Sequence, residues 1–432
     1  MKISDTPQRR NLSRRDFVKG STVAGLAALL TNTSRIHAAG SDKIRVGIIG
    51  CGRRGTFDAK NCVNSSENVV ITAMGDLFAD KLENSRNYLT EKLPDKVQVT
   101  NENCFVGWDA YKDVLKTDID LVILTETPHF RPAHLRAAVE AGKHVFMEKP
   151  VAVDPVGVRS VIESSKLAQE KNLTILAGTQ LRRISHIVEI IKRIHRGDIG
   201  EILSGQYVRI GDAMLNWGPD QRDSHWSDME WQIRNWLFNT WLSGDFIVEM
   251  HVHNLDLMNW AMGSTPIQCI AMGGRQVRTD PQYGNVYDHF AVEYEYPNGV
   301  RIEYMGAQMD AVTVRLDHRL VGTKGSAYFD FGNAFIEGQK PFKYEDTIPD
   351  PHIIQHADQI NAIRNGLVLN EGKRIAESTL TSIMGRVSAY TGRALTWNWI
   401  MNASKLDLSL PDYEFGPRPT GPVAMPGKTP LI

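Results

Sequence analysis

Two short stretches carry side chains that could transfer a proton. In the first, Glu148-Lys149-Pro150 follows an apolar run. A proline there removes an N–H and ends the strand, so that Lys149 can project beyond the strand's end. A lysine close to a bound ligand can have its pKa lowered enough for proton transfer. The alternative is a solvated surface lysine.

The second stretch, residues 244–256, contains Glu249 and His253. These two residues are four positions apart, so they lie on one face of a helix if the segment is helical. The Glu249 carboxylate could then orient the His253 imidazole, which would act as acid or base. His251 and His253 also form a His-x-His pair, a pattern that occurs at metal centres. Because no further ligand cluster is apparent, we expect no metal; a structural histidine pair is the alternative.

Aromatic side chains precede this second stretch. Five tryptophans lie within residues 217–241, namely Trp217, Trp226, Trp231, Trp236 and Trp241. Indole faces stack on the apolar faces of sugar rings, so we expect Trp231 and Trp236 to form walls of a substrate pocket. Anchors of an irregular core region are the alternative.

A turn that could bind phosphate lies nearer the N-terminus. Gly50, Gly52 and Gly55 form a G-x-G-x-x-G pattern after the strand-like run 43–49. The first glycine permits a tight turn, the second lets the backbone approach a pyrophosphate, and the third lets helix pack on strand. The helix expected over 56–63 would direct its free N–H groups at the phosphates.

The acid that should accompany this turn is Asp76, after the strand-like run 69–74. Its separation from the glycines is that of a carboxylate that binds ribose hydroxyls. These features predict an NAD site; the alternative is a glycine turn without a ligand. Asp76 would repel a 2′-phosphate, which favours NAD, whereas Arg53 and Arg54 leave NADP open.

The elements that must position these residues alternate as strand and helix. Strands are expected over 118–124 and 142–150, with a helix over 132–141 between them. This alternation predicts a Rossmann-type, doubly wound parallel sheet over residues 40–150. Ligands then bind beyond the carboxyl ends of the strands, where residues 126–129 and 148–149 lie.

A second α/β domain is expected over 151–400. Alternating strand patterns at 201–210 and 268–329, with a hairpin turn at 297–299, predict an open, mainly antiparallel sheet. Helices are expected over 156–171, 185–196, 355–367 and 374–392, and the late ones can pack back on the first domain. The Pro-rich residues 401–432 should form an extended arm.

The first 39 residues have the composition of an export signal. Arg14 and Arg15 precede a short apolar stretch at 20–30, as in a twin-arginine signal. We therefore expect export to the periplasm, with a retained membrane anchor as the minor alternative. The net charge of −1 gives no electrostatic reason to expect nucleic acid or an anionic membrane as a partner.

These motifs together resemble the glucose–fructose oxidoreductase, inositol dehydrogenase and rhizopine-catabolism (Gfo/Idh/MocA) family. The likeness rests on the glycine turn, Ala141-Gly142-Lys143-His144-Val145, Glu148-Lys149-Pro150 and His253-x-x-Asp256. It implies a Rossmann domain, a second domain whose open sheet builds homo-oligomers, a catalytic Lys149 and a catalytic His253. The family's usual aspartate falls on Glu249. His251 stands where glycine is usual, which implies an added polar group in the substrate pocket.

The resemblance also implies contacts with cofactor and substrate. The expected cofactor-binding residues beyond the glycine turn and Asp76 are Thr127, His129, Glu148 and Gln180. Thr127-Pro128 is displaced by one position from the family's Thr-Pro pair. Together with Gln180 and the tryptophans, Arg182 would shape the substrate pocket, which also includes Lys149, His251 and His253.

Three functions follow as hypotheses. The first is an NAD(P)-dependent oxidoreductase that acts on a sugar, glycoside or polyol: His253, assisted by Lys149 and oriented by Glu249, takes the hydroxyl proton, and the nucleotide is tightly held. The second is an NAD-dependent glycosidase that oxidises C3 transiently, eliminates the aglycone, adds water and returns the hydride. The third is a sugar- or nucleotide-binding protein without catalysis.

Overall fold

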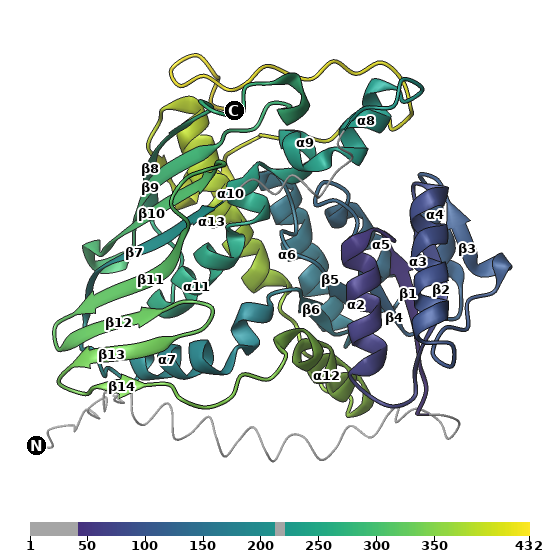
Figure 1. Ribbon diagram of the computed structural model, residues 1–432, viewed down its shortest axis with the longest axis horizontal. Coiled ribbons are helices and arrows are strands. Elements are labelled where there is room, and N and C mark those ends of the chain that lie inside the picture. Colours follow the sequence, from purple (N-terminus) through teal and green to yellow (C-terminus); the bar gives the residue numbers. More distant parts are fainter. Residues whose placement is uncertain (1–41, 212–220) are drawn as a thin grey trace, which may run out of the picture. The chain divides into compact units, whose positions relative to one another are not determined.

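The computed structural model describes residues 42–211 and 221–432. The predicted export signal and Trp217 therefore lie outside the described residues. Figure 1 shows the two sheets with their covering helices.

The first sheet has six strands in the order β3-β2-β1-β4-β5-β6, and every neighbouring pair is parallel. This order confirms the predicted doubly wound sheet. Apart from the edge strand β3, its strands are largely buried, which explains why they read as apolar runs; all four residues of β4 are buried. The strands are β1 (Ile44–Ile49), β2 (Val69–Asp76), β3 (Cys104–Val106), β4 (Leu121–Leu124), β5 (His144–Met147) and β6 (Ile175–Ala177).

Helices connect these strands. They are α2 (Arg53–Asn64), α3 (Ala79–Lys92), α4 (Ala110–Lys116), α5 (Arg131–Glu140) and α6 (Pro155–Glu170), with a 3-10 turn η2 (Asn101–Asn103) before β3. Helix α2 begins three residues earlier than expected, because Gly52 is already the extended residue that precedes the first turn. The sheet also continues past residue 150, since α6 connects β5 to β6. A division at 150 therefore separates a crossover helix and the last strand from the sheet that they complete.

The second sheet has nine strands in the order β14-β13-β12-β11-β7-β10-β9-β8-β15. Only β7 and β10 pair in parallel, so the sheet is mainly antiparallel as predicted. The strands are β7 (Ile202–Gly211), β8 (Gln268–Gly274), β9 (His289–Glu295), β10 (Arg301–Gln308), β11 (Arg315–Gly322), β12 (Gly325–Phe329), β13 (Ala334–Gly338), β14 (Phe342–Lys343) and β15 (Leu395–Thr396). The predicted turn at 297–299 joins β9 to β10, with Asn298 at φ 69°.

Helices cover one face of this sheet and extend back to the first domain. They are α7 (Ser185–His195), α8 (Asp228–Arg234), α9 (Thr240–Ser243), α10 (Phe246–Glu249), α11 (Val252–Met262), α12 (Pro351–Arg364), α13 (Gly372–Thr391) and α14 (Trp397–Asn402), with 3-10 turns η3 (Gln180–Arg183), η5 (Trp236–Phe238), η6 (Pro281–Tyr283) and η7 (Pro297–Gly299). Helix α12 packs on α2 and η3, and α13 packs on α6, α11 and β8. Almost every side chain of α13 is buried, so this helix joins the cores of the two domains.

The last residues contain neither helix nor strand. From Ala403 onwards the chain runs as an extended segment beside α8 and α9 (Figure 1). The segment is not free of the body. It hydrogen-bonds and stacks on both domains, as described below.

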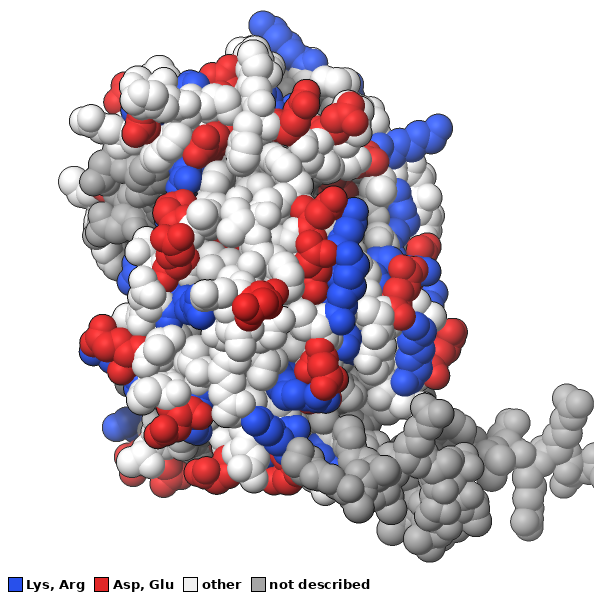
Figure 2. All heavy atoms as spheres, turned by 90° about the vertical axis from the view of Figure 1, so that its right-hand side faces the viewer, with Lys and Arg blue, Asp and Glu red and all other residues white. Residues whose placement is uncertain are grey.

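The surface carries charges of both signs. On the face shown in Figure 2, Lys and Arg side chains alternate with Asp and Glu around a stripe of uncharged residues. No helix in the described part of the chain is long and apolar enough to cross a membrane.

Candidate active site

The glycine turn lies between β1 and α2 and is held against the end of β4. Gly50 has φ +91°, and a Cβ there would lie 2.4 Å from the backbone nitrogen of Glu126. A Cβ on Gly55 would lie 1.9 Å from the carbonyl oxygen of Gly50, whereas one on Gly52 would meet nothing within 4 Å. The first and third glycines are therefore required by packing, and the second leaves the N-terminus of α2 open to a ligand.

Asp76 flanks this turn at the end of β2. Its Oδ2 accepts a hydrogen bond from the backbone N–H of Cys51 (2.6 Å), and its Oδ1 accepts one from Phe78 (2.8 Å). Burial raises the pKa of the carboxyl, and these two hydrogen bonds partly oppose the shift. The carboxyl is thus fixed beside the glycine turn, as a ribose-binding acid must be.

The two arginines of the turn differ. Arg53 is exposed, whereas Arg54 donates to Glu148 (2.6 Å) and to Asp58 (3.0 Å). The Glu148 carboxyl fits against Gly178, where a Cβ would lie 1.9 Å from its Oε1. The Arg54 guanidinium therefore connects α2 to the end of β5 and is not free for a 2′-phosphate.

Lys149 and Glu249 come together from different domains. The Lys149 Nζ donates to Glu249 Oε1 (2.8 Å) and to the Glu249 carbonyl oxygen (2.7 Å), and the lysine side chain is 10% exposed. The expectation that Glu249 orients His253 is wrong in this geometry. The helix breaks at Met250-His251, so Glu249 ends α10 while His253 lies in α11. The carboxylate consequently meets the lysine.

His253 is buried beside three cations. Burial, followed by the charges of Lys149, Arg209 and Arg54, holds the pKa of His253 well below its usual value. The imidazole is therefore neutral near pH 7 and can accept a proton. Arg209 lies on β7 and donates to the carbonyl oxygen of Met250 (2.9 Å) and to Asn254 Oδ1 (3.1 Å), at the break between α10 and α11.

His251 contacts the second sheet. Its Nδ1 forms a hydrogen bond with the Tyr304 hydroxyl of β10, and its ring meets Phe246 edge-on. A Cβ on Gly306 would lie 2.7 Å from that Nδ1, so the neighbouring strand leaves space for the contact. The predicted polar group in the substrate pocket is instead a buried link between α11 and the sheet.

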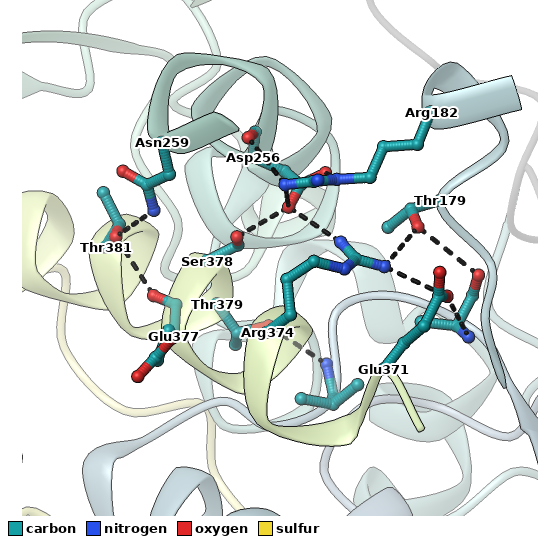
Figure 3. Close-up of polar contacts among 12 residues, drawn as sticks. Thr179, Arg182, Asp256, Asn259, Glu371, Arg374, Glu377, Ser378, Thr379 and Thr381 are labelled. Carbon is teal, nitrogen blue, oxygen red and sulfur yellow. Dashed lines mark hydrogen bonds and ion pairs between the residues drawn. The ribbon is translucent and has the colours of Figure 1, made fainter. Parts of the chain in front are cut away.

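Arg182 is also engaged elsewhere. Its Nε and Nη2 donate to the two carboxylate oxygens of Asp256 (2.6 and 3.0 Å), and its guanidinium lies over the Trp260 ring. Asp256 also accepts from Arg374 and Ser378, as Figure 3 shows. The two arginine charges hold the pKa of Asp256 far below its usual value despite burial. This cluster fixes η3 to α11 and α13, which is a structural role.

Three further predicted residues are Trp231, Trp236 and His129. Trp231 stacks on Trp226, with ring centroids 6.4 Å apart. Trp236 packs in an apolar cluster with Trp241 and Phe130. The His129 ring is buried, and its Nε2 forms a hydrogen bond with the Tyr413 hydroxyl (2.8 Å). Burial lowers the pKa of His129 to about 4. None of these three residues has a ring contact or hydrogen bond with Lys149 or His253 within the described residues.

Buried polar side-chain atoms without a hydrogen-bond partner indicate whether a dinucleotide fits at the edge of the first sheet. Thr127 Oγ1, Gln180 Oε1, His253 Nδ1 and Glu249 Oε2 are buried and lack a hydrogen-bond partner in the described part of the chain. Buried polar atoms are normally paired, so a polar ligand at this edge of the first sheet would satisfy them. Together with the open approach at Gly52, these atoms fit a dinucleotide. Across residues 42–211 and 221–432, no group of three or more His, Cys, Asp or Glu is placed to hold a metal ion.

Sequence reasoning missed two residues here. Thr125 donates from Oγ1 to the Gly50 carbonyl oxygen (2.7 Å) and so fixes the turn. Arg209 could have been found, because it stands at a core-facing position of an alternating strand, where a charge needs a reason. The fold is therefore of the Rossmann type with a second, mainly antiparallel sheet, and the glycine turn and the orphaned atoms fit a dinucleotide.

Two family models match consecutive parts of the chain. The model described as oxidoreductase family, NAD-binding Rossmann fold, matches residues 44–179, and a GFO/IDH/MocA C-terminal domain model matches residues 187–328. The chain therefore belongs to the Gfo/Idh/MocA oxidoreductase family, whose Rossmann domain supports a nicotinamide cofactor. A twin-arginine translocation signal model matches residues 11–31, which confirms the predicted export signal and indicates the periplasm.

Relatives with curated names include sugar-acting enzymes. The chain is 27% identical over 311 residues to a 2,7-anhydro-N-acetylneuraminate hydratase of Escherichia coli strain K12, covering 70% of this chain and 73% of the relative. It is 29% identical over 236 residues to a glycosyl hydrolase family 109 protein of Shewanella pealeana, covering 49% of each. The structure of an aldose-aldose oxidoreductase from Caulobacter crescentus superimposes with a TM-score of 0.65 at 18% identity, covering 82% of this chain and 99% of that one, and shows the shared fold.

Proposed function

We propose that the protein is an exported, nicotinamide-dependent enzyme that oxidises a hydroxyl-bearing carbon of a sugar or glycoside. The observation that carries this proposal is the neutral, buried His253 beside the Lys149–Glu249 ion pair, both at the carboxyl edge of the first sheet. A base and a charged donor there suit removal of a proton from a hydroxyl while hydride leaves the same carbon.

Each residue has a separate task in this reaction. Bound nicotinamide supplies the hydride acceptor. His253 takes the hydroxyl proton, for which its ring must be neutral, as its lowered pKa keeps it. Lys149 uses two of its N–H groups on Glu249, so the third can donate to the substrate oxygen and stabilise negative charge as it forms. Glu249 holds Lys149 in place and keeps its charge paired.

The expected cofactor is NAD. Asp76 lies beside the glycine turn, where we expect the ribose hydroxyls, and would repel a 2′-phosphate, while Arg54 is held by Glu148 and Asp58. Thr127, Glu148 and Gln180 would complete the nicotinamide side of the site.

A second candidate is a redox-neutral reaction on a glycoside. The names of the hydratase and the glycosyl hydrolase among the relatives favour it, since neither describes a net oxidation. Oxidation of a ring carbon acidifies the neighbouring C–H; the aglycone can then be eliminated, water added and the hydride returned. The same residues would serve, and a retained nucleotide would be regenerated in each turnover.

One experiment tests both candidates. Purified protein is incubated with 4-nitrophenyl glycosides, with and without added NAD⁺, and NADH and 4-nitrophenol are measured. Net oxidation predicts NADH only when NAD⁺ is added; the redox-neutral reaction predicts 4-nitrophenol without added NAD⁺. Lys149→Ala and His253→Ala should abolish either signal, and full activity in both variants would contradict the proposed site.

We also propose a homo-oligomer formed through the outer face of the second sheet. On that face β8 presents Ile270 and Met272, the latter 75% exposed, and β10 presents Met305 in the same cross-strand row as Met272. Adjacent exposed apolar residues on a sheet face favour burial against a partner.

A further inference from the structure

The C-terminal segment returns to the first domain. The Leu408 backbone N–H donates to Asp154 Oδ2 (2.9 Å), which caps the first turn of α6, and the Tyr413 hydroxyl meets His129. Phe415 stacks on Phe78 (ring centroids 5.9 Å apart, planes 24° apart) and lies 5.2 Å from the Trp108 ring. The segment 408–418 thus contacts the first domain at several points along its length.

The aromatic partners of this segment share a position in the fold. Phe78 follows β2, Trp108 follows β3, and Phe130, which Tyr413 contacts edge-on, follows β4. The sheet order β3-β2-β1-β4 places the glycine turn after β1 between β2 and β4. A segment that touches the residues after β2, β3 and β4 therefore crosses the edge at which a dinucleotide binds.

Helix α8 contacts the same edge from the second domain. Both terminal nitrogens of Arg234 donate to the carboxylate of Asp80 (3.1 and 3.0 Å), and its guanidinium lies 3.9 Å from the centre of the Phe78 ring. Phe78 and Asp80 lie two and four residues beyond Asp76. Arg234 therefore fixes the loop that follows the ribose-binding acid.

Helix α8 and the C-terminal segment are also bound to each other. The Met229 N–H donates to the Gly416 carbonyl oxygen (3.1 Å), and the Gln232 Nε2 donates to the Arg418 carbonyl oxygen (2.5 Å). In turn, the Arg418 N–H donates to Asp228 Oδ2 (3.1 Å), and its guanidinium lies over the Trp241 ring. The two elements form one layer against the first domain.

We propose that residues 408–418, together with Arg234, form the outer wall of the adenosine half of the dinucleotide site and retain the nucleotide. This inference rests on the proposed function, since it needs a dinucleotide at that edge. The nucleotide can leave only when Phe415 and Arg234 separate from Phe78 and Asp80. An exported enzyme with this wall keeps a nucleotide that it acquired while folding.

Nucleotide release tests the proposal. Full-length protein is loaded with NADH, and the loss of bound NADH fluorescence is followed after addition of excess NAD⁺. Phe415→Ala and Arg234→Gln should each accelerate release roughly tenfold, since each removes one stacked or charged contact. The matched control is Phe331→Ala, between β12 and β13: Phe331 is 44% exposed and Phe415 is 45% exposed. This control should release NADH at the wild-type rate.

The outcomes distinguish a failure of the proposed wall from a failure of the proposed dinucleotide site. If both variants release NADH at the wild-type rate, or the control accelerates release equally, the proposed wall is overturned while the dinucleotide site stands. If the wild-type protein binds neither NAD(H) nor NADP(H), the proposed function fails and the wall fails with it. The two variants lie on different elements, so misfolding of one, seen in its melting curve, leaves the other as the test.

Discussion

Lys149 and Glu249 form a two-point contact across the domain boundary, in which Nζ donates both to the carboxylate (2.8 Å) and to the backbone carbonyl of the same glutamate (2.7 Å). The lysine comes from the end of β5 in the first domain, and the glutamate ends α10 in the second. This pair therefore links the end of β5 to the end of α10 at the candidate site.

Removal of Glu249 should act through Lys149. Breaking a buried ion pair costs about 3 kcal/mol and frees the lysine to move, so Glu249→Ala should lower both stability and kcat, the latter about 100-fold. Because the two residues act as a unit, the Lys149→Ala/Glu249→Ala double variant should lose no more activity than Lys149→Ala alone. Additive losses, measured in a double-mutant cycle, would show that Glu249 acts on another group. Glu91→Ala, at an exposed glutamate of α3, is the control.

Arg209 should set the acidic limb of the pH profile. Its positive charge lowers the pKa of the buried His253, and Arg209→Gln removes that charge, so the imidazole should protonate at a higher pH. The acidic limb of kcat/KM should therefore move upward by about one pH unit. Arg209→Lys, which keeps the charge, should move the limb much less. An unchanged limb in Arg209→Gln would mean that the limb reports a different group.

The first sheet could be predicted from the sequence because local signals specify it. The apolar runs, the glycine turn and Asp76 are short-range features, and each lies where the pattern indicated. Contacts across the domains could not be predicted in the same way. The spacing of Glu249 and His253 suggested one helix face, but the break at Met250-His251 redirected the carboxylate to Lys149.

The contacts of charged residues near the site could not be predicted from the sequence either. A motif shows that Arg182 is present, but only the fold shows that Asp256 already holds it. The composition of residues 401–432 predicts an extended arm, since prolines disfavour regular structure. Its contacts with Phe78 and His129 depend on residues more than 280 positions away, and composition carries no such information.

Buried neutral histidines should make the protein sensitive to acid. Burial lowers the pKa of His318 to about 3, below the value of about 6.5 expected in the unfolded chain. Between these values only the unfolded chain takes up the proton, so the free energy of unfolding should fall as pH decreases below 6.5. The expected slope is about 1.4 kcal/mol per pH unit for this residue.

A substitution isolates that contribution. His318→Gln should reduce the pH dependence of unfolding by about one proton, measured with urea between pH 7 and 5. His129 and His356, whose pKa values burial lowers to about 4 and about 3, should keep the remaining slope positive. The control is His225→Gln, at an exposed side chain, and its slope should equal that of the wild type. An unchanged slope in His318→Gln would show that this ring is accessible to protons in the folded state.

The exposed row on the second sheet should determine assembly. Met272 on β8 lies in register with Ala291 on β9, which lies in register with Met305 on β10, so a charge at Met272 would enter the centre of a sheet-to-sheet contact. Met272→Glu should therefore convert the wild-type oligomer to a smaller species, as measured by light scattering after size-exclusion chromatography. Met425→Glu, at an exposed methionine of the C-terminal segment, should keep the wild-type mass. A monomeric wild type, or equal dissociation in both variants, would rule out this face as the interface.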